Sequence, residues 1–350
     1  MIRVFVAVFS LIALSSNSPL LAVSTSIGYS DSTVQRTIFA RLSEKPGPLT
    51  LTIKSDFTSI LQARKMPRTD FGAEVIQRDG QGPAVSWPAD LSLRGKFRRM
   101  RCQFPPLRVQ FKKDTLRALG LADHNDLKLV THCMDDPDSS RENILREYLC
   151  YRLYNILTPI SYRVQLAEIT YEDTQGGLPP KTRYGFFMED FDELAQRLEG
   201  VQCDSLGLGA KNTDPAQENL VYVFQYMISN ADWDYRYLRN LKAVKQESSN
   251  FRLLIPYDFD HSGLVKTKYA VPRRELGQAS VRERIYLGRP ADPRVFKNTL
   301  AHFQEKKNAL MDEVRNFELL SRESRNDILE FLRQFYASFD LLRSLAVKEE

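Results

Sequence analysis

Cysteine is scarce in this sequence, and the four cysteines stand in none of the spacings that hold structural zinc. Because there is no C-x-x-C pair, a zinc site is not expected. No G-x-S-x-G occurs either, which argues against a serine hydrolase built on a strained nucleophile turn. Gly80-Gln81-Gly82 is too weak a signal to count as a Gly-rich phosphate loop.

Long runs of one residue type are also missing. No five consecutive residues are basic, and a net charge of +5 over 350 residues is too small to predict a nucleic-acid partner. Residues 96–101, KFRRMR, form a local basic cluster, which either ends a strand or hairpin in solvent or binds an anion. A hydrophobic fraction of 43% with 27% charged residues predicts an ordinary globular protein with a sizeable core.

The N-terminus has the pattern of a secretory signal peptide at residues 1–24. Arg3 precedes an apolar run at residues 4–14, and small residues follow with possible cleavage contexts at Ser15 and Ser24. The run is shorter than the ~20 apolar residues that a membrane span needs, although an uncleaved anchor is the alternative. We therefore expect an exported protein, periplasmic or at the cell surface or outside the cell, with no membrane span after signal removal.

Export would permit disulfides. Four cysteines, Cys102, Cys133, Cys150 and Cys203, allow two disulfides in three possible pairings. Cys150 lies in an apolar helical stretch, so a buried free thiol is the alternative for it.

The first half of the chain predicts strands. Residues 49–111 contain LTLTIKSDF, LSLRGKF and PLRVQFKK, which alternate apolar and polar residues as an antiparallel sheet does. Residues 139–157 change to helical spacing, with Ser139 or Ser140 as the expected cap. SYRVQLAEITYED and KTRYGFFMED then predict a hairpin.

The second half predicts mainly helices. An apolar helix from Pro215 to about Ser229 leads into a polar loop, and FRLLIPYDFD is a short strand that ends in acids. Two long helical patterns follow at residues 293–319 and 324–345. The order predicts an α+β protein with a β-rich N-terminal lobe at residues 25–190, a mostly helical C-terminal lobe at residues 191–350, and a cleft between them.

Two acidic stretches would border that cleft, SNADWDYRYLRN at residues 229–240 and YDFDHSG at residues 257–263. Taken singly, each is typical of a turn, because Asp and Asn bond to nearby backbone. Taken together, they place carboxylates beside a core, where burial must be offset by a cation or hydrogen bonds. Magnesium prefers such oxygen ligands, and phosphoryl transfer uses Asp, Asn and Asp in this order.

These stretches resemble the CotH kinase family of spore-coat proteins, and HipA-like kinases share a looser form of the layout. In the family a helix leads into an N-x-D motif, an Asn follows, and a strand ends in an aromatic-Asp-x-Asp-x-Ser motif. The matching residues are Asn230, Asp232, Asn240, Asp258, Asp260 and Ser262. LSLRGKF, PLRVQF and the stretch around residues 127–153 resemble the family further upstream, so the resemblance covers residues 91–265, half of the chain.

The resemblance implies a bilobal protein-kinase-like fold that uses ATP with Mg²⁺ or Mn²⁺. It implies Asp232 as the catalytic Asp, with Asp234 as its competitor, and Asn240 and Asp258 as metal ligands. Asp260 would hold a second metal or orient a water molecule.

The cationic residue of the N-terminal lobe departs from the family pattern, because the paired Lys is replaced by Phe104-Pro105 and a later Lys by Gln110. Arg108 is therefore the candidate for the nucleotide phosphates, with Lys112 and Arg94 behind it. Its helix partner would be Glu147 or Glu142. His261 and His132 are expected to be structural, or in the case of His261 to support Asp260.

The leading hypothesis is an exported kinase that transfers the γ-phosphoryl group of ATP to a protein or sugar hydroxyl. The alternative is a non-catalytic, pseudokinase-like binding or assembly protein of the surface or envelope, which the missing Lys favours.

Overall fold

The structure is a computed structural model, and it describes residues 35–78, 80, 82–203, 212–249 and 251–347. The predicted signal peptide at residues 1–24 lies outside these residues. Among the described helices, none combines the length and the apolar character that crossing a membrane requires. The described residues form a mixed α+β structure, as the sequence predicts.

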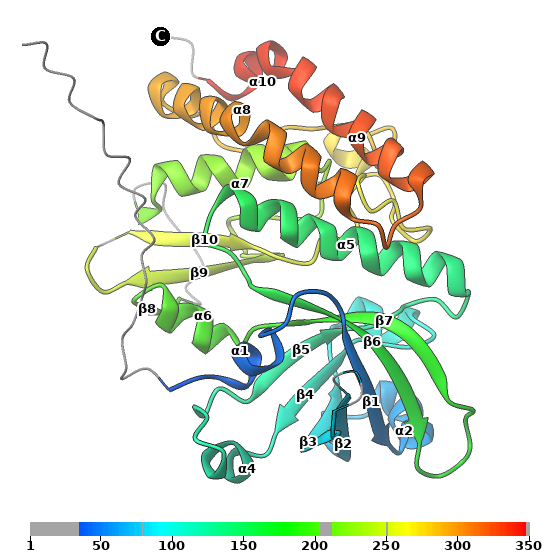
Figure 1. The fold of residues 1–350 in the computed structure, drawn as a ribbon. Helices are drawn as coiled ribbons and strands as arrows, with labels where there is room; N and C mark the ends of the chain where they lie inside the picture. Colours follow the sequence, from blue (N-terminus) through cyan, green and yellow to red (C-terminus); the bar gives the residue numbers. More distant parts are fainter. Residues whose placement is uncertain (1–34, 79, 81, 204–211, 250, 348–350) are drawn as a thin grey trace, which may run out of the picture. The chain divides into compact units, whose positions relative to one another are not determined.

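Seven strands close into a barrel in the order β1-β2-β3-β4-β5-β7-β6 (Figure 1). They are β1 (Leu49–Ser55), β2 (Phe71–Arg78), β3 (Val85–Leu93), β4 (Leu107–Phe111), β5 (Asp126–Val130), β6 (Val164–Asp173) and β7 (Lys181–Met188). The predicted hairpin is the antiparallel pair β6 and β7. The parallel pairing of β1 with β6 closes the barrel, so the strands leave no open edge.

Alternation along the strands fills the barrel. In β4, Leu107, Val109 and Phe111 are buried, and Arg108 and Gln110 between them are half-buried. The same period of two places Leu51 and Ile53 of β1 inside, because neighbouring side chains of a strand point to opposite faces. One face of each strand therefore forms the barrel core.

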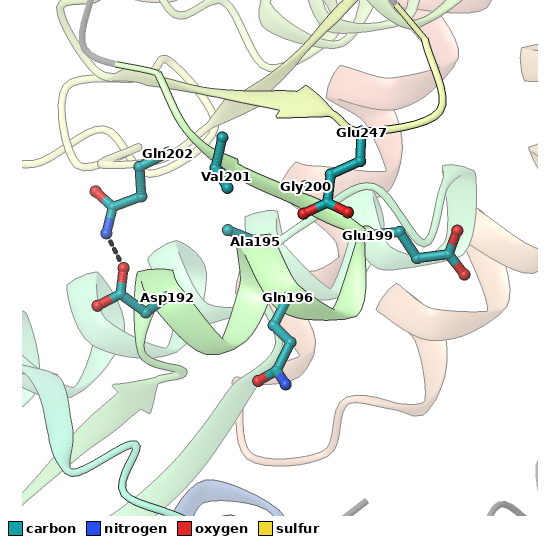
Figure 2. A pocket seen from close by; sticks show the side chains of 8 residues that line it. All are labelled: Asp192, Ala195, Gln196, Glu199, Gly200, Val201, Gln202 and Glu247. Carbon is teal, nitrogen blue, oxygen red and sulfur yellow. Dashed lines mark hydrogen bonds between the residues drawn. The ribbon is translucent and has the colours of Figure 1, made fainter.

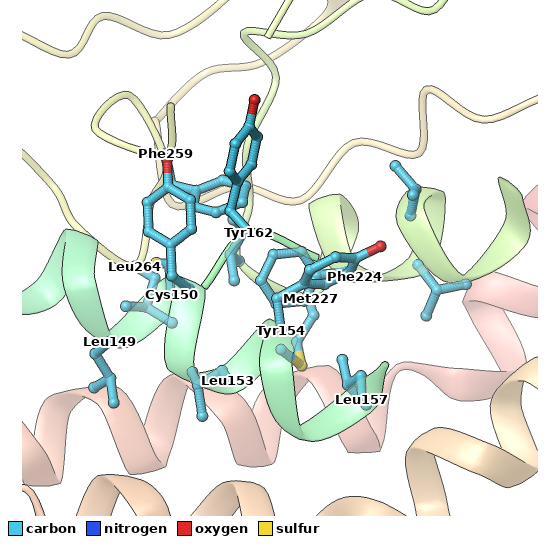
Figure 3. Close-up of a cluster of buried hydrophobic side chains, with 14 of the residues drawn as sticks. Leu149, Cys150, Leu153, Tyr154, Leu157, Tyr162, Phe224, Met227, Phe259 and Leu264 are labelled. Carbon is cyan, nitrogen blue, oxygen red and sulfur yellow. The ribbon is translucent and has the colours of Figure 1, made fainter. Parts of the chain in front are cut away.

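Helix α5 (Pro137–Leu157) contacts both β7 of the barrel and α8 (Pro293–Asn316) of the helical part. It is the predicted helix, but it begins two residues earlier and its cap is Asp136, which accepts a hydrogen bond from the Ser139 N–H. Leu153 and Tyr154 of α5 pack in the cluster of Figure 3 with Phe224. This core joins the barrel to the helices.

The helical part also contains a small sheet. Its main helices are α7 (Pro215–Met227), α8, α9 (Arg322–Ala337) and α10 (Phe339–Ala346), and its sheet has the order β10-β9-β8, from β8 (Gly200–Gln202), β9 (Leu241–Gln246) and β10 (Arg252–Pro256). The prediction of one helix at residues 324–345 is wrong, because the chain breaks at Ser338 into α9 and α10. Strands β8 and β9 were not predicted.

Short elements complete the described chain. They are α1 (Ile38–Leu42), α2 (Phe57–Gln62), η1 (Ala63–Lys65), α3 (Phe97–Arg101), α4 (Lys113–Ala118), α6 (Phe191–Arg197) and η3 (Arg274–Leu276). The basic cluster at residues 96–101 is thus neither a strand end nor a hairpin but contains the single-turn helix α3 between β3 and β4.

Candidate functional site

The first acidic stretch follows α7 as a loop held by its own side chains. The Asn230 carboxamide oxygen accepts a hydrogen bond from the Asp232 N–H at 3.0 Å, and the Trp233 indole N–H donates to the Asn230 carbonyl at 3.1 Å. The Trp233 ring stacks on Tyr222 of α7. Because a buried aromatic ring anchors it, the loop presents Asp232 in a defined position.

The second acidic stretch follows β10 and is held by contacts to α5 and to its own turn. The Asp258 N–H donates to the Tyr151 hydroxyl at 2.8 Å, and Thr267 donates to the Asp260 carbonyl at 3.0 Å. A Cβ at Gly263 would lie 2.4 Å from the Val281 carbonyl oxygen, so no larger residue fits there. The turn after the acids is therefore tightly packed.

Asn240 and Asp258 both have left-handed backbone, with φ of 54° and 63°. This conformation is costly for residues other than glycine, and Asn and Asp tolerate it best. Such backbone occurs often at functional sites, which agrees with a role for these two positions.

One pocket of about 470 Å³ brings the two stretches together. Five of the predicted site residues line it, namely Glu147, Asp232, Asn240, Asp258 and Asp260. Pro106 and Val130 of the barrel part line it as well. The pocket therefore lies where the barrel meets the helical part.

Arg98 of α3 reaches into this pocket and binds three of the acids. Its Nη2 lies 2.9 Å from Glu147 Oε1 and 2.6 Å from Asp258 Oδ1, and its Nε lies 2.7 Å from Asp260 Oδ2. Only 9% of the Arg98 side chain is exposed. Burial lowers the pKa of Arg98, but Asp260, Glu147 and Asp258 outweigh it and raise that pKa well above the ordinary value.

The three acids respond differently to this cluster. Burial raises the pKa of Glu147 to about 8, against the opposing effect of Arg98. Burial also raises the pKa of Asp258, where Arg98 again opposes and Asp260 adds to the shift. Burial acts the same way on Asp260, but Arg98 outweighs it through charge and a hydrogen bond, so the pKa of Asp260 lies below its ordinary value. Of the three acids, Asp260 is therefore the one for which Arg98 more than offsets the effect of burial on the pKa.

The donor types of the pocket suit a hard cation, but their arrangement does not. Among the described residues, no group of three or more His, Cys, Asp or Glu side chains is placed to hold a metal ion. Asn240 points its amide nitrogen at Asp232, 3.1 Å from Oδ2, and Arg98 occupies Asp258 and Asp260. The predicted metal ligands meet in one pocket, but in this structure the cation bound by Asp258 and Asp260 is the Arg98 guanidinium.

Asp232 and Asp234 have different surroundings. Asp232 lines the pocket, and its Oδ1 lies 3.2 Å from Arg273. Asp234 instead accepts hydrogen bonds from the N–H groups of Arg236 and Tyr237 within its own turn. Of the two, Asp232 is placed to meet a ligand.

The predicted phosphate ligands Arg108 and Lys112 do not line this pocket, which corrects the sequence interpretation. Arg108 pairs with Asp126 of β5 at 2.5 Å, and Lys112 pairs with Asp90 of β3. As the alternation predicts, Arg108 and Lys112 lie on the face of this region that points away from the barrel core. On that face, carboxylates of adjacent strands neutralise both side chains. Glu142 likewise bonds to Arg146, which leaves Glu147 as the helix carboxylate of the pocket.

The cations that do line the pocket come mostly from the β3–β4 connection. They are Arg94, Lys96 and Arg98, joined by Arg239. Within the described residues, the Arg94 side chain has no hydrogen bond or ion pair. From the sequence, Arg94 is only a secondary candidate for the phosphates and Arg98 is not a candidate. The basic cluster KFRRMR, which contains Arg98, is nevertheless predicted as a possible anion site.

Lys128 of β5 contacts a ring that lines the pocket. Its ammonium sits over two rings, 5.3 Å from the centroid of Tyr162 and 5.1 Å from that of Tyr257, and Tyr257 lines the pocket. Burial lowers the pKa of Lys128 to about 7, helped by Arg94 and Lys242. Sequence reasoning also missed this residue, because a single Lys in an alternating strand carries no signal.

The two histidines singled out in the sequence lie in different parts of the structure. His261 lines the pocket 3.9 Å from Asp260 and packs against Phe97. His132 is buried in the barrel part and stacks on Phe104.

A second pocket, of about 690 Å³, lies at α6 and β8 (Figure 2). Asp192, Glu199 and Glu247 line it without any cationic or histidine side chain, and Gln202 bonds to Asp192. Its lining does not bring acids and cations together as the lining of the first pocket does.

No family model matches this chain, and no curated protein is similar to it at a significant level. A solved structure that is similar is the crystal structure of a Helicobacter pylori proinflammatory kinase, CtkA, with a TM-score of 0.38 and 10% sequence identity. The match covers 68% of this chain and 94% of that chain. At this level of similarity, the function proposed below rests on the pocket alone.

Proposed function

We propose that this protein is an exported atypical kinase with a bilobal, protein-kinase-like fold. The barrel part would form the N-terminal lobe and the helical part the C-terminal lobe, with ATP in the pocket between them. The γ-phosphoryl group would pass to a protein or sugar hydroxyl, with Mg²⁺ or Mn²⁺ as the expected metal. The observation that carries this proposal is the meeting of Asp232, Asn240, Asp258, Asp260 and Glu147 in one pocket.

The charges of the pocket support a polyanionic ligand beside a carboxylate base. Arg94 and Lys96 bring positive charge from the barrel side, and a triphosphate needs such cations. Asp232 lines the same pocket in a loop anchored by Trp233. The nucleotide would therefore find cationic ligands and a proton acceptor in the same pocket.

The proposed transfer follows from these positions. The acceptor oxygen forms a bond to the γ-phosphorus, the bond from that phosphorus to the β,γ-bridging oxygen breaks, and ADP leaves. Asp232 orients the acceptor hydroxyl and takes its proton.

The alternative function is a pseudokinase-like binding or assembly protein of the surface or envelope. One observation favours it, namely that Arg98 already neutralises the acids that would hold a metal. In that case the fold serves binding and the pocket transfers no phosphate.

The two functions are separated by a nucleotide and transfer assay on residues 25–350. We expect ATP binding and metal-dependent phosphorylation by the wild type. Asp232→Ala and Asp258→Ala should each reduce transfer by roughly 100-fold or more, the usual effect of losing a general base or a main electrostatic group. Asp192→Asn, in the second pocket, is the matched control and should behave as wild type.

The possible outcomes differ clearly. Nucleotide binding without transfer at any Mg²⁺ or Mn²⁺ concentration would favour the pseudokinase. Absence of nucleotide binding would rule out the kinase and leave the binding or assembly protein. Export is tested separately by sequencing the N-terminus of the protein made in full length, which we expect to begin after residue 24.

A further inference from the structure

Arg98 is the most densely paired cation of the pocket. Its guanidinium bridges Glu147 of α5 to Asp258 and Asp260 of the loop after β10. The Tyr269 hydroxyl also donates to Asp260 Oδ2, at 3.0 Å. One barrel-side residue thus joins acids from two separate elements of the helical side.

The segment that carries Arg98 has a covalent tie at only one end. Cys102 follows α3 directly and forms a disulfide with Cys133. At the other end Gly95 has φ of 76°, and a Cβ there would meet nothing within 4 Å. Phe97 and Met100 of α3 are 47% and 48% exposed. Among the residues of α3 only Arg98 is buried, so α3 is not fixed by a hydrophobic core of its own.

Some contacts hold α3 in place apart from Arg98. The Arg99 guanidinium donates to the Ala63 carbonyl at 2.9 Å, and the Phe97 ring packs on His261 at 5.6 Å between centroids. Neither contact involves the acids. The interaction of Arg98 with the carboxylates is therefore separable by mutation from the packing of α3.

A guanidinium and a divalent cation would compete for the same oxygens. Arg98 bonds to Asp258 Oδ1 and Asp260 Oδ2 directly, and a metal ion would need these carboxylates as ligands. Removing Arg98 alone leaves buried acids without a counter-charge, which is strongly destabilising. A divalent ion would supply that counter-charge in its place.

We infer that Arg98 is an internal occupant of the cation position between Asp258 and Asp260, and that a divalent ion binds there only when α3 withdraws Arg98. The contact is an autoinhibitory one, because α3 controls whether the pocket holds its own arginine or a metal. This inference rests on the proposed function for the identity of the metal, but its test needs no nucleotide.

The test is Mn²⁺ titration of the oxidised protein, residues 25–350, without nucleotide. Wild type, Arg98→Ala and Arg98→Lys are compared by calorimetry, with Arg101→Ala as the control on the exposed side of the same helix. We expect Arg98→Ala to bind Mn²⁺ roughly 5- to 150-fold more tightly than wild type, the usual size of coupling between mutually exclusive ligands. Arg98→Lys should fall between the two, and Arg101→Ala should equal wild type.

Equal or weaker Mn²⁺ binding by both Arg98 variants would overturn the inference, and so would the absence of binding in all proteins. If Arg98→Ala is unfolded without metal, its refolding on addition of Mn²⁺ supports the inference. If Mn²⁺ does not refold it, the Arg98→Lys titration decides.

Hydrogen exchange of the wild type gives a second, independent readout. At saturating Mn²⁺ we expect the amides of residues 96–101 to exchange faster, because α3 has moved. Metal binding by the wild type with unchanged exchange there would overturn the inference. If Mn²⁺ replaces Arg98 in a protein that transfers no phosphate, this inference stands and the kinase proposal fails.

Discussion

Arg94 and Arg108 are both arginines of the β3–β4 region, but their surroundings differ. Arg108 of β4 forms an ion pair with Asp126 of the neighbouring strand β5. Arg94 lines the pocket and, among the described residues, has no ion pair. A cation without a partner in a pocket is free to bind an anionic ligand, and one that is already neutralised is not.

This difference predicts opposite results for two matched substitutions. Arg94→Gln should weaken ATP binding by roughly 10- to 100-fold, the loss expected for a charged hydrogen bond worth ~1.5–3 kcal/mol. Arg108→Gln should leave ATP affinity unchanged. Fluorescent-nucleotide titration measures both, and equal losses for the two variants would contradict the placement of the phosphate site.

His132 predicts how stability depends on pH. Burial lowers its pKa from 6.5 to about 3, with Arg183 and Lys181 adding to the shift, and neither ring nitrogen has a hydrogen-bond partner among the described residues. Between these values the unfolded chain takes up a proton that the folded chain does not. The contribution of His132 to the free energy of unfolding therefore falls as pH drops below 6.5, by roughly 2 kcal/mol between pH 7 and 5.

The variant His132→Phe should remove that part of the pH dependence, because phenylalanine cannot titrate and keeps the ring stack on Phe104. Denaturant midpoints at pH 7 and pH 5 measure it. His124→Gln, at a side chain that bonds to Gln196, is the control. An unchanged pH dependence in His132→Phe would mean that His132 is not buried in its neutral form.

At the scale of elements, the disulfide ties α3 to the segment before α5. Cys102 and Cys133 are 31 residues apart in sequence, and closing such a loop contributes about 3–4 kcal/mol in the chain-entropy model. The sequence allowed three pairings, and the structure selects the Cys102–Cys133 disulfide and does not join Cys150 to Cys203. Cys150 is buried, as the alternative for it predicted.

Reduction should therefore destabilise the protein by about 2–4 kcal/mol, the usual effect of losing a native disulfide. Chemical denaturation with and without reductant measures the difference. The double variant Cys102→Ser/Cys133→Ser should match the reduced wild type and show no further response to reductant. A response in that variant would show that another cysteine pair contributes.

The elements themselves were predicted where their signals are local. The alternation of β4 and the helical spacing of α5 depend only on near neighbours, so both elements were found. The cap of α5 was misplaced, because Asp136 and Pro137 are also good starting residues. The break at Ser338 was missed, because the apolar pattern continues through it from α9 into α10.

At the scale of the whole molecule, Asp327 of α9 links distant elements. Its Oδ2 accepts bonds from Arg146 of α5 at 2.9 Å, Lys266 at 3.0 Å and Arg282 at 3.1 Å. Burial raises the pKa of Asp327, but the hydrogen bonds from these cations outweigh it and lower the pKa. One carboxylate thus holds α5 and α9 to the loop after the second acidic stretch.

Asp327→Asn should destabilise the protein by about 1–3 kcal/mol, because it leaves the buried Arg146 with less compensating charge. Thermal unfolding measures the loss. Asp340→Asn, at an exposed pair on α10 with Arg343, is the control and should change stability by less than about 1 kcal/mol. Equal effects would contradict the linking role of Asp327.

The sequence by itself determined the α+β composition, most of the elements and the two acidic stretches, because hydrophobic periodicity and turn chemistry act between near neighbours. Asp232, Asn240, Asp258 and Asp260 meet in one pocket because the loop after α7, the start of β9 and the loop after β10 come together there. Only the tertiary structure decided the closure of the barrel through β1 and β6, the pairing of Arg108 with Asp126, and the place of Arg98 among three acids. These depend on contacts between residues far apart in sequence, and for charged side chains the nearest partner in space decides the role.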